Sequence, residues 1–331
     1  MNEIQTGVTQ DIPDNRNLRF EDAVGAVEAP SWEEGFDLEE IYGPLTMKDQ
    51  GHSLSCVGQA FSYYAEMLNK IEENRNVPLS ARYIYSQIHL PEGTSRLADA
   101  AKVVTSQGVA PEEVCKSYPN DEQSFYVLPT DEAKEMAATF KAKSYATVAP
   151  LVDEVRKAIF SGHGVVTAIT GSYAAWHKDI RKGVIHPPQS GEQGFGHAMY
   201  LLGYKIMDGV KTVIARDSYG PYSGDNGRKY IPWEEYFNAD FNGTNCLFNL
   251  WTLLDLPNKY KSPFMFNLVK GTGPNIYAVK NGSKSLIINE TSFKQGNELG
   301  LWADISQVNT VTDEVLKGFP EVKSILFIDQ N

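Results

Sequence analysis

Apolar residues recur at helical spacing in the first half of the chain. The clearest pattern follows Gly58, where the spaced residues are Ala60, Phe61, Tyr64, Met67 and Leu68, with no Gly or Pro among them. It predicts a largely buried helix that carries Cys56 in its first turn. Further helices are predicted after Ser80 as N-cap and over Arg96–Gln107, Pro129–Tyr145 and Leu151–Phe160.

The second half of the chain is built from short apolar runs that are typical of strands. The predicted strands are Val165–Ile169, Gly196–Tyr204, Thr212–Asp217, Lys229–Pro232 and Leu247–Leu253. Helices therefore come first and strands second, without regular alternation. This order predicts an α+β fold.

The two ends of the chain differ from this central region. Residues 1–40 are polar, acidic and interrupted by Pro13 and Pro30, which predicts an extended N-terminal arm on the domain surface. After Asp255 a linker-like run leads to two predicted strands, Asn275–Val279 and Ser285–Ile288, around a hairpin signal at Lys280–Ser283. We therefore expect three parts: an arm over 1–40, a main domain over 41–255 and a small β-rich module over 256–331.

Composition narrows the class of protein. The 331 residues are 42% hydrophobic and 22% charged, enough for one substantial domain and a small one. A net charge of −12 argues against a general nucleic-acid binder, and no apolar run is long enough to span a bilayer. The start, Met1–Gln5, has neither the basic residues nor the apolar core of a secretion signal. We expect a cytoplasmic or virion-associated protein.

Three cysteines are too few for a disulfide framework and show no metal-ligand spacing, so no metal or cofactor is expected. Cys56 differs from the other two because it lies at the start of a predicted helix. There the unpaired backbone N–H groups and the helix dipole favour the thiolate, which is the nucleophilic form. Free cysteines are also common core residues, so Cys56 alone leaves both interpretations open.

The residues around Cys56 favour the nucleophile. The segment Asp49-Gln50-Gly51, followed after three residues by Ser55-Cys56 and a helix, resembles the active-site segment of papain-like cysteine peptidases. The resemblance implies a two-lobe fold with the Cys helix in a helical lobe and its base in a strand-rich lobe. It also implies that Gln50, six residues before the cysteine, donates to the oxyanion. The residues after Cys56 look more like the bacterial branch of the family.

The same resemblance assigns the other members of a triad. His197, within Gly196-His197-Ala198 at the start of an apolar strand, is similar to the family's base, and Asp217-Ser-Tyr-Gly occupies the place of Asn-Ser-Trp-Gly. Asp217 then replaces the orienting Asn, and Tyr219 replaces a shielding Trp. The Asp charge should raise the pKa of His197 in a dry site. A second family Trp is Ser223 here; if the shield is poorer, water competes with the hydrogen bond and this gain in pKa shrinks.

Substrate contacts are also implied by the family pattern. The turn Glu92–Ser95 resembles the segment that pairs with a bound peptide, which makes Gly93 and Thr94 candidates; a capping turn without a ligand is the alternative. Gly196 and Tyr219 are further candidates beside the triad. The remaining loop histidines, His52, His163 and His177, are interpreted as surface residues. Gly224–Gly227 resembles part of a calcium loop but is interpreted as a hairpin turn.

The leading hypothesis is a cysteine peptidase that acts on a peptide or protein substrate. The order Cys, His, Asp also fits transglutaminases and arylamine acetyltransferases, although Gln50 argues against acyl transfer to an amine. A third hypothesis is a catalytically weak domain that serves in a phage particle or on a cell surface.

The final module resembles those of bacterial and phage surface proteins, and we expect a docking or assembly unit, with a stabilising flap as the alternative. Members of this family often carry a large inhibitory propeptide. Either the short N-terminal arm inhibits the enzyme in the same way, or the activity is controlled by another mechanism.

Overall fold

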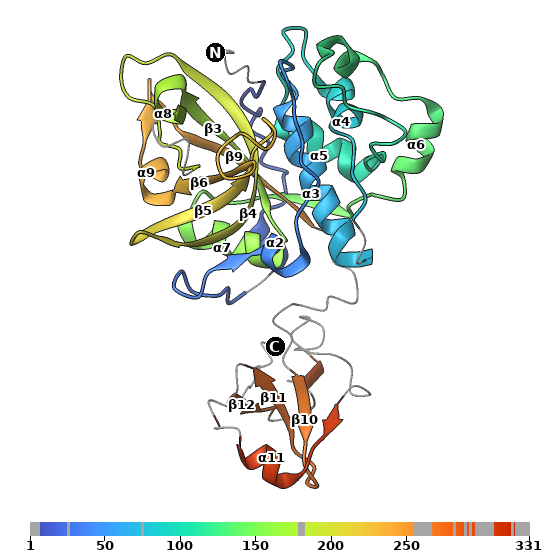
Figure 1. Cartoon of the computed structure of the whole chain (residues 1–331), viewed down its shortest axis with the longest axis vertical. Coiled ribbons are helices and arrows are strands. Elements are labelled where there is room, and N and C mark those ends of the chain that lie inside the picture. The colour runs from blue at the N-terminus through green and yellow to red at the C-terminus, as the bar shows by residue number, and fades with distance from the viewer. Residues whose placement is uncertain are drawn as a thin grey trace. The chain divides into compact units, whose positions relative to one another are not determined.

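The computed structural model describes residues 7–24, 27–73, 76–177, 183–254, 267–280, 283–287, 290, 293–294, 308–318 and 321. The chain divides into two compact units, Met1–Asp255 and Leu256–Asn331. The larger unit combines a helical lobe with an antiparallel sheet (Figure 1). The predicted α+β class is thus confirmed.

The helical lobe is formed by segments from the first half of the chain. Its elements are α3 (Cys56–Glu73), α4 (Ala81–Ile88), α5 (Leu97–Ser106), η1 (Glu122–Tyr126) and α6 (Asp131–Ala137). Helix α3 is buried from Cys56 to Asn69, as its apolar spacing predicts. Ser80 caps α4 by accepting the N–H of Tyr83, which confirms that signal. After α5, Gly108 has φ +92°, a conformation that favours glycine.

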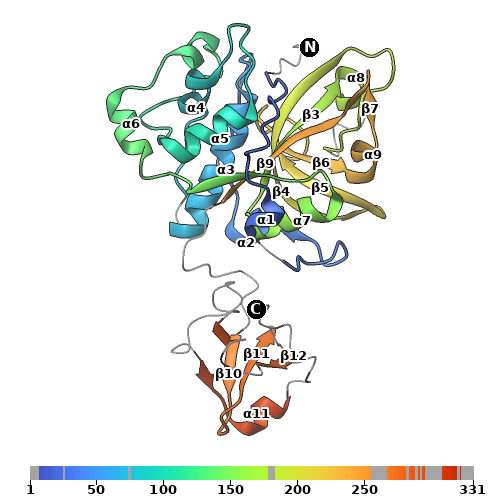
Figure 2. The same cartoon turned by 180° about the vertical axis from the view of Figure 1, so that it is seen from behind.

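The second lobe is a seven-stranded sheet in the order β2-β9-β3-β4-β5-β6, with β1 paired to β4. Its strands are β1 (Phe36–Asp37), β2 (Ser144–Thr147), β3 (Val165–Ser172), β4 (Gly194–Met207), β5 (Val210–Arg216), β6 (Arg228–Pro232) and β9 (Leu247–Leu254). Every pair in it is antiparallel. The five strands that the pattern predicts in this half are all present. Figure 2 shows the sheet from behind, with α3 at the junction of the two lobes.

Short elements surround the sheet. They are α1 (Phe20–Val24), α2 (Leu38–Tyr42), α7 (Val152–Ser161), α8 (Tyr173–His177), α9 (Trp233–Phe237) and the two-stranded β7 (Asp240–Phe241) with β8 (Thr244–Asn245). Helix α3 is tied to the sheet by Tyr64, whose hydroxyl accepts the N–H of Leu253 at 3.1 Å and whose ring lies 5.0 Å from that of Tyr200. The helix that carries Cys56 is therefore fixed against the central strands.

Two segments differ from the sequence prediction. The predicted helix Pro129–Tyr145 ends at Ala137, and its last part begins β2. There buried Ala146 and Val148 alternate with partly exposed neighbours, and Tyr145 packs edge-on against Trp251. This alternation has the period of a strand at a sheet edge, and packing against the neighbouring strand overrides the local helical propensity.

The N-terminal arm is more embedded than a surface extension. Phe20, Trp32 and Phe36 are each at most 6% exposed, and the last two pack on the ring of Tyr204. Apolar side chains of this size stay buried because exposing them would cost about 2–3 kcal/mol each. The expectation of a surface arm therefore fails for these residues, which belong to the core.

The smaller unit contains a four-stranded sheet in the order β12-β11-β10-β13 and a helix, α11 (Asp313–Gly318). Its strands are β10 (Asn267–Lys270), β11 (Ile276–Lys280), β12 (Ser283–Leu286) and β13 (Asn309–Thr310). The predicted hairpin is confirmed by the pairing of Lys280 with Ser283; residues 281, 282 and 288 of that prediction lie outside the described part. Leu268, Ala278 and Ile287 form its core. The docking role of this module stays a prediction.

Candidate active site

Cys56 is the first residue of α3 and is fully buried. A tight polar turn leads into it: the Ser53 N–H and hydroxyl both donate to the carbonyl of Gln50, and the Ser53 and Ser55 hydroxyls lie 2.7 Å apart. Such short polar side chains favour turns over helix because they bond to nearby backbone. The turn ends where the helix begins, so the cysteine sulfur stands at the helix N-terminus.

His197 lies in β4, paired in register with Ile169 of β3. Its Nε2 lies 2.9 Å from Oδ1 of Asp217, and both side chains are 0% exposed. Burial lowers the pKa of His197, but interactions with Asp217 and Cys56 outweigh it and raise the pKa to about 9. Because Nε2 is used by Asp217, Nδ1 is the nitrogen available to the Cys56 thiol.

Asp217 directly follows β5 and is held by several donors. Its Oδ1 also accepts the Ser218 N–H at 2.8 Å, and its Oδ2 accepts the Ser223 hydroxyl at 2.6 Å. Burial raises the pKa of Asp217, but His197, Lys229 and Ser223 lower it to about 2. The carboxylate is therefore ionised. Ser223, which stands where relatives have a Trp, thus contributes a hydrogen bond to the triad acid.

Two aromatic rings enclose the imidazole. Tyr219 stacks on His197 with ring centroids 5.4 Å apart and 21° between planes, and Trp176 of α8 meets it edge-on at 5.4 Å. His197 and Asp217 are both fully buried although Tyr219 and Ser223 stand in the places of two Trp residues of the family pattern. Tyr219 fills the place of the missing Trp, and Trp176 adds a second wall. Sequence reasoning missed Trp176 because its segment carries no motif.

Gln50 is oriented from both ends of its side-chain amide. The Ser218 hydroxyl donates to Oε1 at 2.6 Å, and Nε2 donates to the Ser53 carbonyl at 2.8 Å. The Gln50 backbone N–H also donates to the Ser218 carbonyl. The amide is fully buried in the turn before Cys56, beside the residue that follows Asp217. This brings together the four residues that the sequence selects.

Residues of α3 hold the triad acid from the helical lobe. The Tyr63 hydroxyl donates to the Asp217 carbonyl at 3.3 Å and accepts the Lys48 N–H at 2.8 Å. Lys48 in turn pairs with Glu66 at 3.3 Å and donates to the Leu79 carbonyl. Helix α3 therefore positions both the nucleophile and the backbone of the acid.

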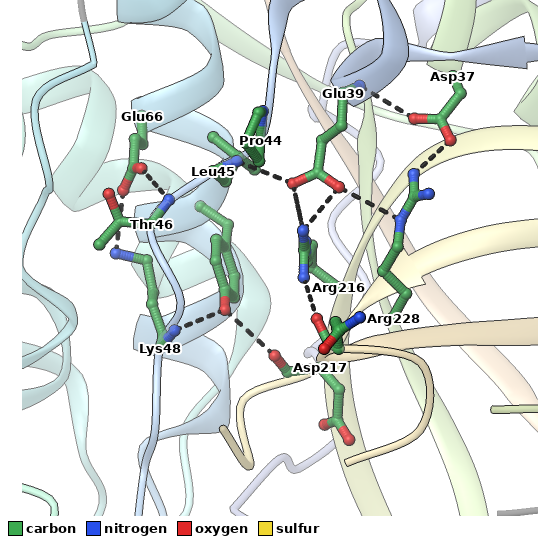
Figure 3. A network of polar contacts seen from close by, with 12 residues as sticks. Asp37, Glu39, Pro44, Leu45, Thr46, Lys48, Glu66, Arg216, Asp217 and Arg228 are labelled. Atoms are coloured by element: carbon green, nitrogen blue, oxygen red, sulfur yellow. Dashed lines mark hydrogen bonds and ion pairs between the residues drawn. The ribbon is translucent and has the colours of Figure 1, made fainter. Parts of the chain in front are cut away.

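A second ionic network lies on the other side of the same strand end. It consists of Asp37, Glu39, Arg216 and Arg228, and we call it the Glu39 cluster. Arg216 forms a bidentate pair with Glu39, with both N···O distances 2.8 Å. Arg228 pairs with Asp37 and lies 3.2 Å from Glu39. Figure 3 shows the Asp217 carboxylate turned away from this cluster. The sequence carries no signal for it, because Glu39 and Arg216 are distant in the chain.

The N-terminal arm crosses the site. The Gly7 N–H donates to Sγ of Cys56 at 3.3 Å, the Ser95 N–H donates to the Gly7 carbonyl at 2.6 Å, and the Thr9 N–H donates to the Ser95 carbonyl at 2.9 Å. A Cβ at Gly7 would lie 1.9 Å from the Leu54 carbonyl oxygen, so only glycine fits at this position of the arm. On the opposite side a Cβ at Gly196 would lie 2.9 Å from Val8. A chain segment thus runs between the two lobes over the thiol.

This segment indicates which groups of the cleft pair with a peptide backbone. Ser95 offers both its N–H and its carbonyl, whereas the Gly93 N–H bonds to Leu90 and the Gly93 carbonyl accepts from Tyr85. The Thr94 carbonyl also bonds to Leu90. Gly93 and Thr94 shape the turn, and their contact with substrate stays a prediction. Ser95, the last residue of the predicted turn, was not a candidate.

The arm is anchored farther along by Asp11. Its carboxylate accepts the Ala98 N–H at 3.1 Å and the Trp251 Nε1–H at 2.6 Å. These contacts join α5 of the helical lobe to β9 of the sheet. The anchor keeps residues 7–9 next to the thiol.

The other histidines and cysteines stand apart from this chemistry. His52 is exposed and His177 half-buried, but His163 is only 7% exposed, so its prediction as a surface residue is wrong. Burial lowers the pKa of His163 to about 4. The strand Val165–Ser172 that follows it draws this residue into the core. Cys115 and Cys246 are buried free thiols, and burial raises the pKa of each.

In the described ranges no group of three His, Cys, Asp or Glu side chains could hold a metal ion. Asp225 pairs with Arg228 across Asn226 and Gly227, both at positive φ, which confirms the hairpin turn. Across the same residues, no helix is long and apolar enough to cross a membrane.

Comparisons with known proteins agree with this geometry. Residues 34–240 match the sequence model of a family described as "Papain family cysteine protease". Among curated proteins, none matches the sequence. The fold is similar to xylellain, a cysteine protease from Xylella fastidiosa, at 21% identity and a TM-score of 0.63, over 76% of this chain and 96% of that one.

Plant proteins show the same fold. The proform of the ragweed pollen allergen Amb a 11, a cysteine protease, is 20% identical with a TM-score of 0.56, over 70% of this chain and 67% of that one. The Carica candamarcensis cysteine protease CMS1MS2, solved with E-64, is 16% identical with a TM-score of 0.51, over 67% of this chain and 98% of that one. The predicted two-lobe fold is confirmed.

Proposed function

Because the chain belongs to the papain family of cysteine proteases, we propose that it hydrolyses peptide bonds with Cys56 as nucleophile, His197 as base and acid, and Asp217 as orienting group. The observation that carries this proposal is the buried contact between Nε2 of His197 and Asp217 at 2.9 Å. It fixes the imidazole with Nδ1 left for the thiol at the start of α3. A nucleophile, a base and an orienter in one line are the requirement for this chemistry.

In the proposed reaction, Nδ1 of His197 takes the thiol proton, and the Cys56 sulfur attacks the carbonyl carbon of the peptide bond. The carbonyl oxygen becomes an oxyanion, which Nε2 of Gln50 and the Cys56 backbone N–H stabilise. The imidazolium then gives its proton to the leaving amine, and the C–N bond breaks. Water attacks the resulting thioester with His197 as base, which releases the acid and restores the thiol.

The arm closes this site. Gly7–Thr9 pair with Ser95 and cover the sulfur, so a substrate chain and the arm compete for the same backbone groups. We propose that hydrolysis begins when this segment leaves or is cleaved. This supports the hypothesis that the arm does the work of an inhibitory propeptide.

Labelling with an epoxide that traps activated thiolates tests the triad. The full chain and a Gly7→Ala variant, in which the added methyl group would meet the Leu54 carbonyl, are treated in parallel. We expect labelling at Cys56 that is lost in His197→Ala and retained in the matched control His52→Ala, whose histidine is exposed. Slow, equal modification of Cys56, Cys115 and Cys246 would contradict the proposal and favour a catalytically weak domain.

A second measurement separates hydrolysis from acyl transfer. A fluorogenic peptide is supplied with and without a primary amine as acceptor. Hydrolysis predicts the free acid as the main product in both cases. Amide products that dominate at millimolar amine would favour the acyltransferase hypothesis instead.

A further inference from the structure

Lys229 of β6 is a buried cation beside the triad. Its side chain is 0% exposed, and Nζ lies 3.8 Å from Oδ2 of Asp217 and 5.1 Å from the ring centre of Trp176. In the part of the chain that the structure describes, Nζ has no hydrogen-bond partner. Lysine is almost never buried unless it is paired, because an ammonium loses its hydration there. The position therefore needs a reason beyond packing.

The sheet register explains how Lys229 reaches the triad. Strands β5 and β6 pair Arg216 with Arg228 and Ala215 with Lys229. Because side chains alternate across a strand, Arg216 and Arg228 point to one face, where they form the Glu39 cluster. Lys229 points to the other face, as Asp217 does, and it lies diagonally across from the acid. The small side chain of Ala215, directly opposite, leaves room for the lysine.

We propose that Lys229 is a positioning residue of the active site, whose ammonium balances the charge that Asp217 places behind His197. This role rests on the proposed peptidase function. The family pattern has a neutral Asn where this chain has Asp217, and an uncompensated carboxylate would hold the imidazolium proton too firmly. A basic imidazole is a poor acid toward the leaving amine. The Asp217–Lys229 pair restores a neutral environment behind the ring.

Other charged and titratable groups face the same pair and must be considered. They are Cys56 and Tyr63 from α3 and Tyr219 from the loop after β5, which has Asp49 beside it in turn. The Arg216–Glu39 pair lies behind the strand. Arg216 and Glu39 neutralise each other through their bidentate contact. Burial lowers the pKa of Lys229 below its ordinary value and Asp217 offsets part of that shift, which agrees with an ammonium that depends on this carboxylate.

The test is the pH dependence of kcat/KM and of Cys56 alkylation in the full-length chain. Lys229→Met removes the positive charge and keeps an apolar side chain of similar length. The imidazolium is then more stable, so the alkaline limb of the kcat/KM profile should move to higher pH by about 1 unit. Because the imidazolium is then a weaker acid toward the leaving amine, kcat near neutral pH should fall. Asp217→Asn should move the limb to lower pH. The double variant Asp217→Asn/Lys229→Met should return the limb to within about 0.3 unit of the parent.

Lys205→Met is the matched control. Lys205 also lies over an aromatic ring, at 4.9 Å from the centre of Tyr230, but in β4 and away from the triad. We expect no shift of the limb in this variant. If Lys229→Met does not fold, as judged by thermal unfolding, Lys229→Gln is measured in its place.

The outcomes separate this inference from the proposed function. A parent chain with neither hydrolysis nor pH-dependent alkylation of Cys56 overturns both. A parent that is active, with a Lys229 variant that lowers kcat/KM equally at all pH values, overturns the inference alone. A double variant whose alkaline limb lies far from that of the parent also overturns the inference alone, because the two charges would then not compensate each other.

Discussion

Two ionic clusters lie on opposite faces of the same strand end and differ in how fully they are hydrogen-bonded. The triad cluster comprises Cys56, His197, Asp217 and Lys229; the Glu39 cluster comprises Asp37, Glu39, Arg216 and Arg228. In the Glu39 cluster Arg216 makes two bonds to Glu39 and one to the Asn226 carbonyl. Across the described residues, one nitrogen of the Glu39 cluster, Arg228 Nε, has no hydrogen-bond partner but lies 3.2 Å from Glu39. In the triad cluster two nitrogens have none, His197 Nδ1 and Lys229 Nζ, and Lys229 Nζ lies 3.8 Å from Asp217.

This difference distinguishes buried charges that stabilise the fold, in the Glu39 cluster, from buried charges that take part in the proposed reaction, in the triad cluster. A network of closely paired opposite charges such as the Glu39 cluster holds segments together and contains neither a nucleophile nor a base. A site that moves a proton must keep a nitrogen of its base open until substrate arrives. We therefore expect changes in the triad cluster to affect turnover, and changes in the Glu39 cluster to affect stability. Four predictions test the comparison, from the largest effect to the smallest.

The largest effect is expected from removing the nucleophile. Cys56→Ala should reduce kcat/KM by about 10⁴-fold or more, because the covalent step is lost. The free energy of unfolding should change by less than about 1 kcal/mol, since only one sulfur atom is removed. Peptide hydrolysis and denaturant unfolding measure the two quantities. Cys246→Ala, at another buried free cysteine, should leave hydrolysis unchanged; equal losses in both variants would contradict the prediction.

The next effect should fall on stability. Glu39→Gln leaves Arg216 without its anion and Arg228 with Asp37 alone, and the free energy of unfolding should fall by about 3–5 kcal/mol. The kcat of the folded fraction should stay within a few-fold of the parent. The adjacent, exposed Glu40→Gln is the control and should change stability by no more than about 0.5 kcal/mol. Similar unfolding curves for both variants would show that the Glu39 cluster does not stabilise the fold.

The third prediction concerns pH. The pKa of His197 is raised from 6.5 to about 9, so its contribution to stability is complete below pH 6.5 and is lost as pH rises through 9. The pKa of Asp217 is lowered from 3.8 to about 2, so its contribution is complete above pH 3.8 and is lost as pH falls through 2. The stability difference between the parent and Asp217→Asn should therefore shrink at both extremes. Denaturation curves from pH 2 to 10 measure it, and a constant difference would refute the assignment.

The smallest effect should come from the arm, whose Gly7 N–H donates a hydrogen bond to the Cys56 sulfur. Gly7→Ala would place a methyl group against the Leu54 carbonyl and weaken docking, so the initial rate of hydrolysis should rise by about tenfold for each 1.4 kcal/mol of docking energy lost. Progress curves without pre-incubation measure the rate. Gln10→Ala, exposed in the same segment, should have no effect. An unchanged rate in Gly7→Ala would mean that the arm does not limit access.

Local patterns determined much of what this chain forms. The spacing after Gly58 predicts α3 with Cys56 at its start, and the apolar runs predict β4 and β5, with His197 near the start of one strand and Asp217 at the end of the next. These predictions succeed because helical and strand periodicity depend on neighbours only a few residues apart. Gln50 is assigned by the resemblance to the active-site segment of papain-like peptidases, a motif that lies within a few residues of Cys56.

Only the tertiary structure decided what surrounds these residues. Trp176, Lys229 and Ser95 reach the site through strand register and lobe packing, and the arm reaches it through Asp11. The change from helix to strand at Ser144–Thr147 likewise depends on pairing with β9. Such contacts join segments that are far apart in the chain, so their energy depends on the whole fold and leaves no periodic trace in the sequence.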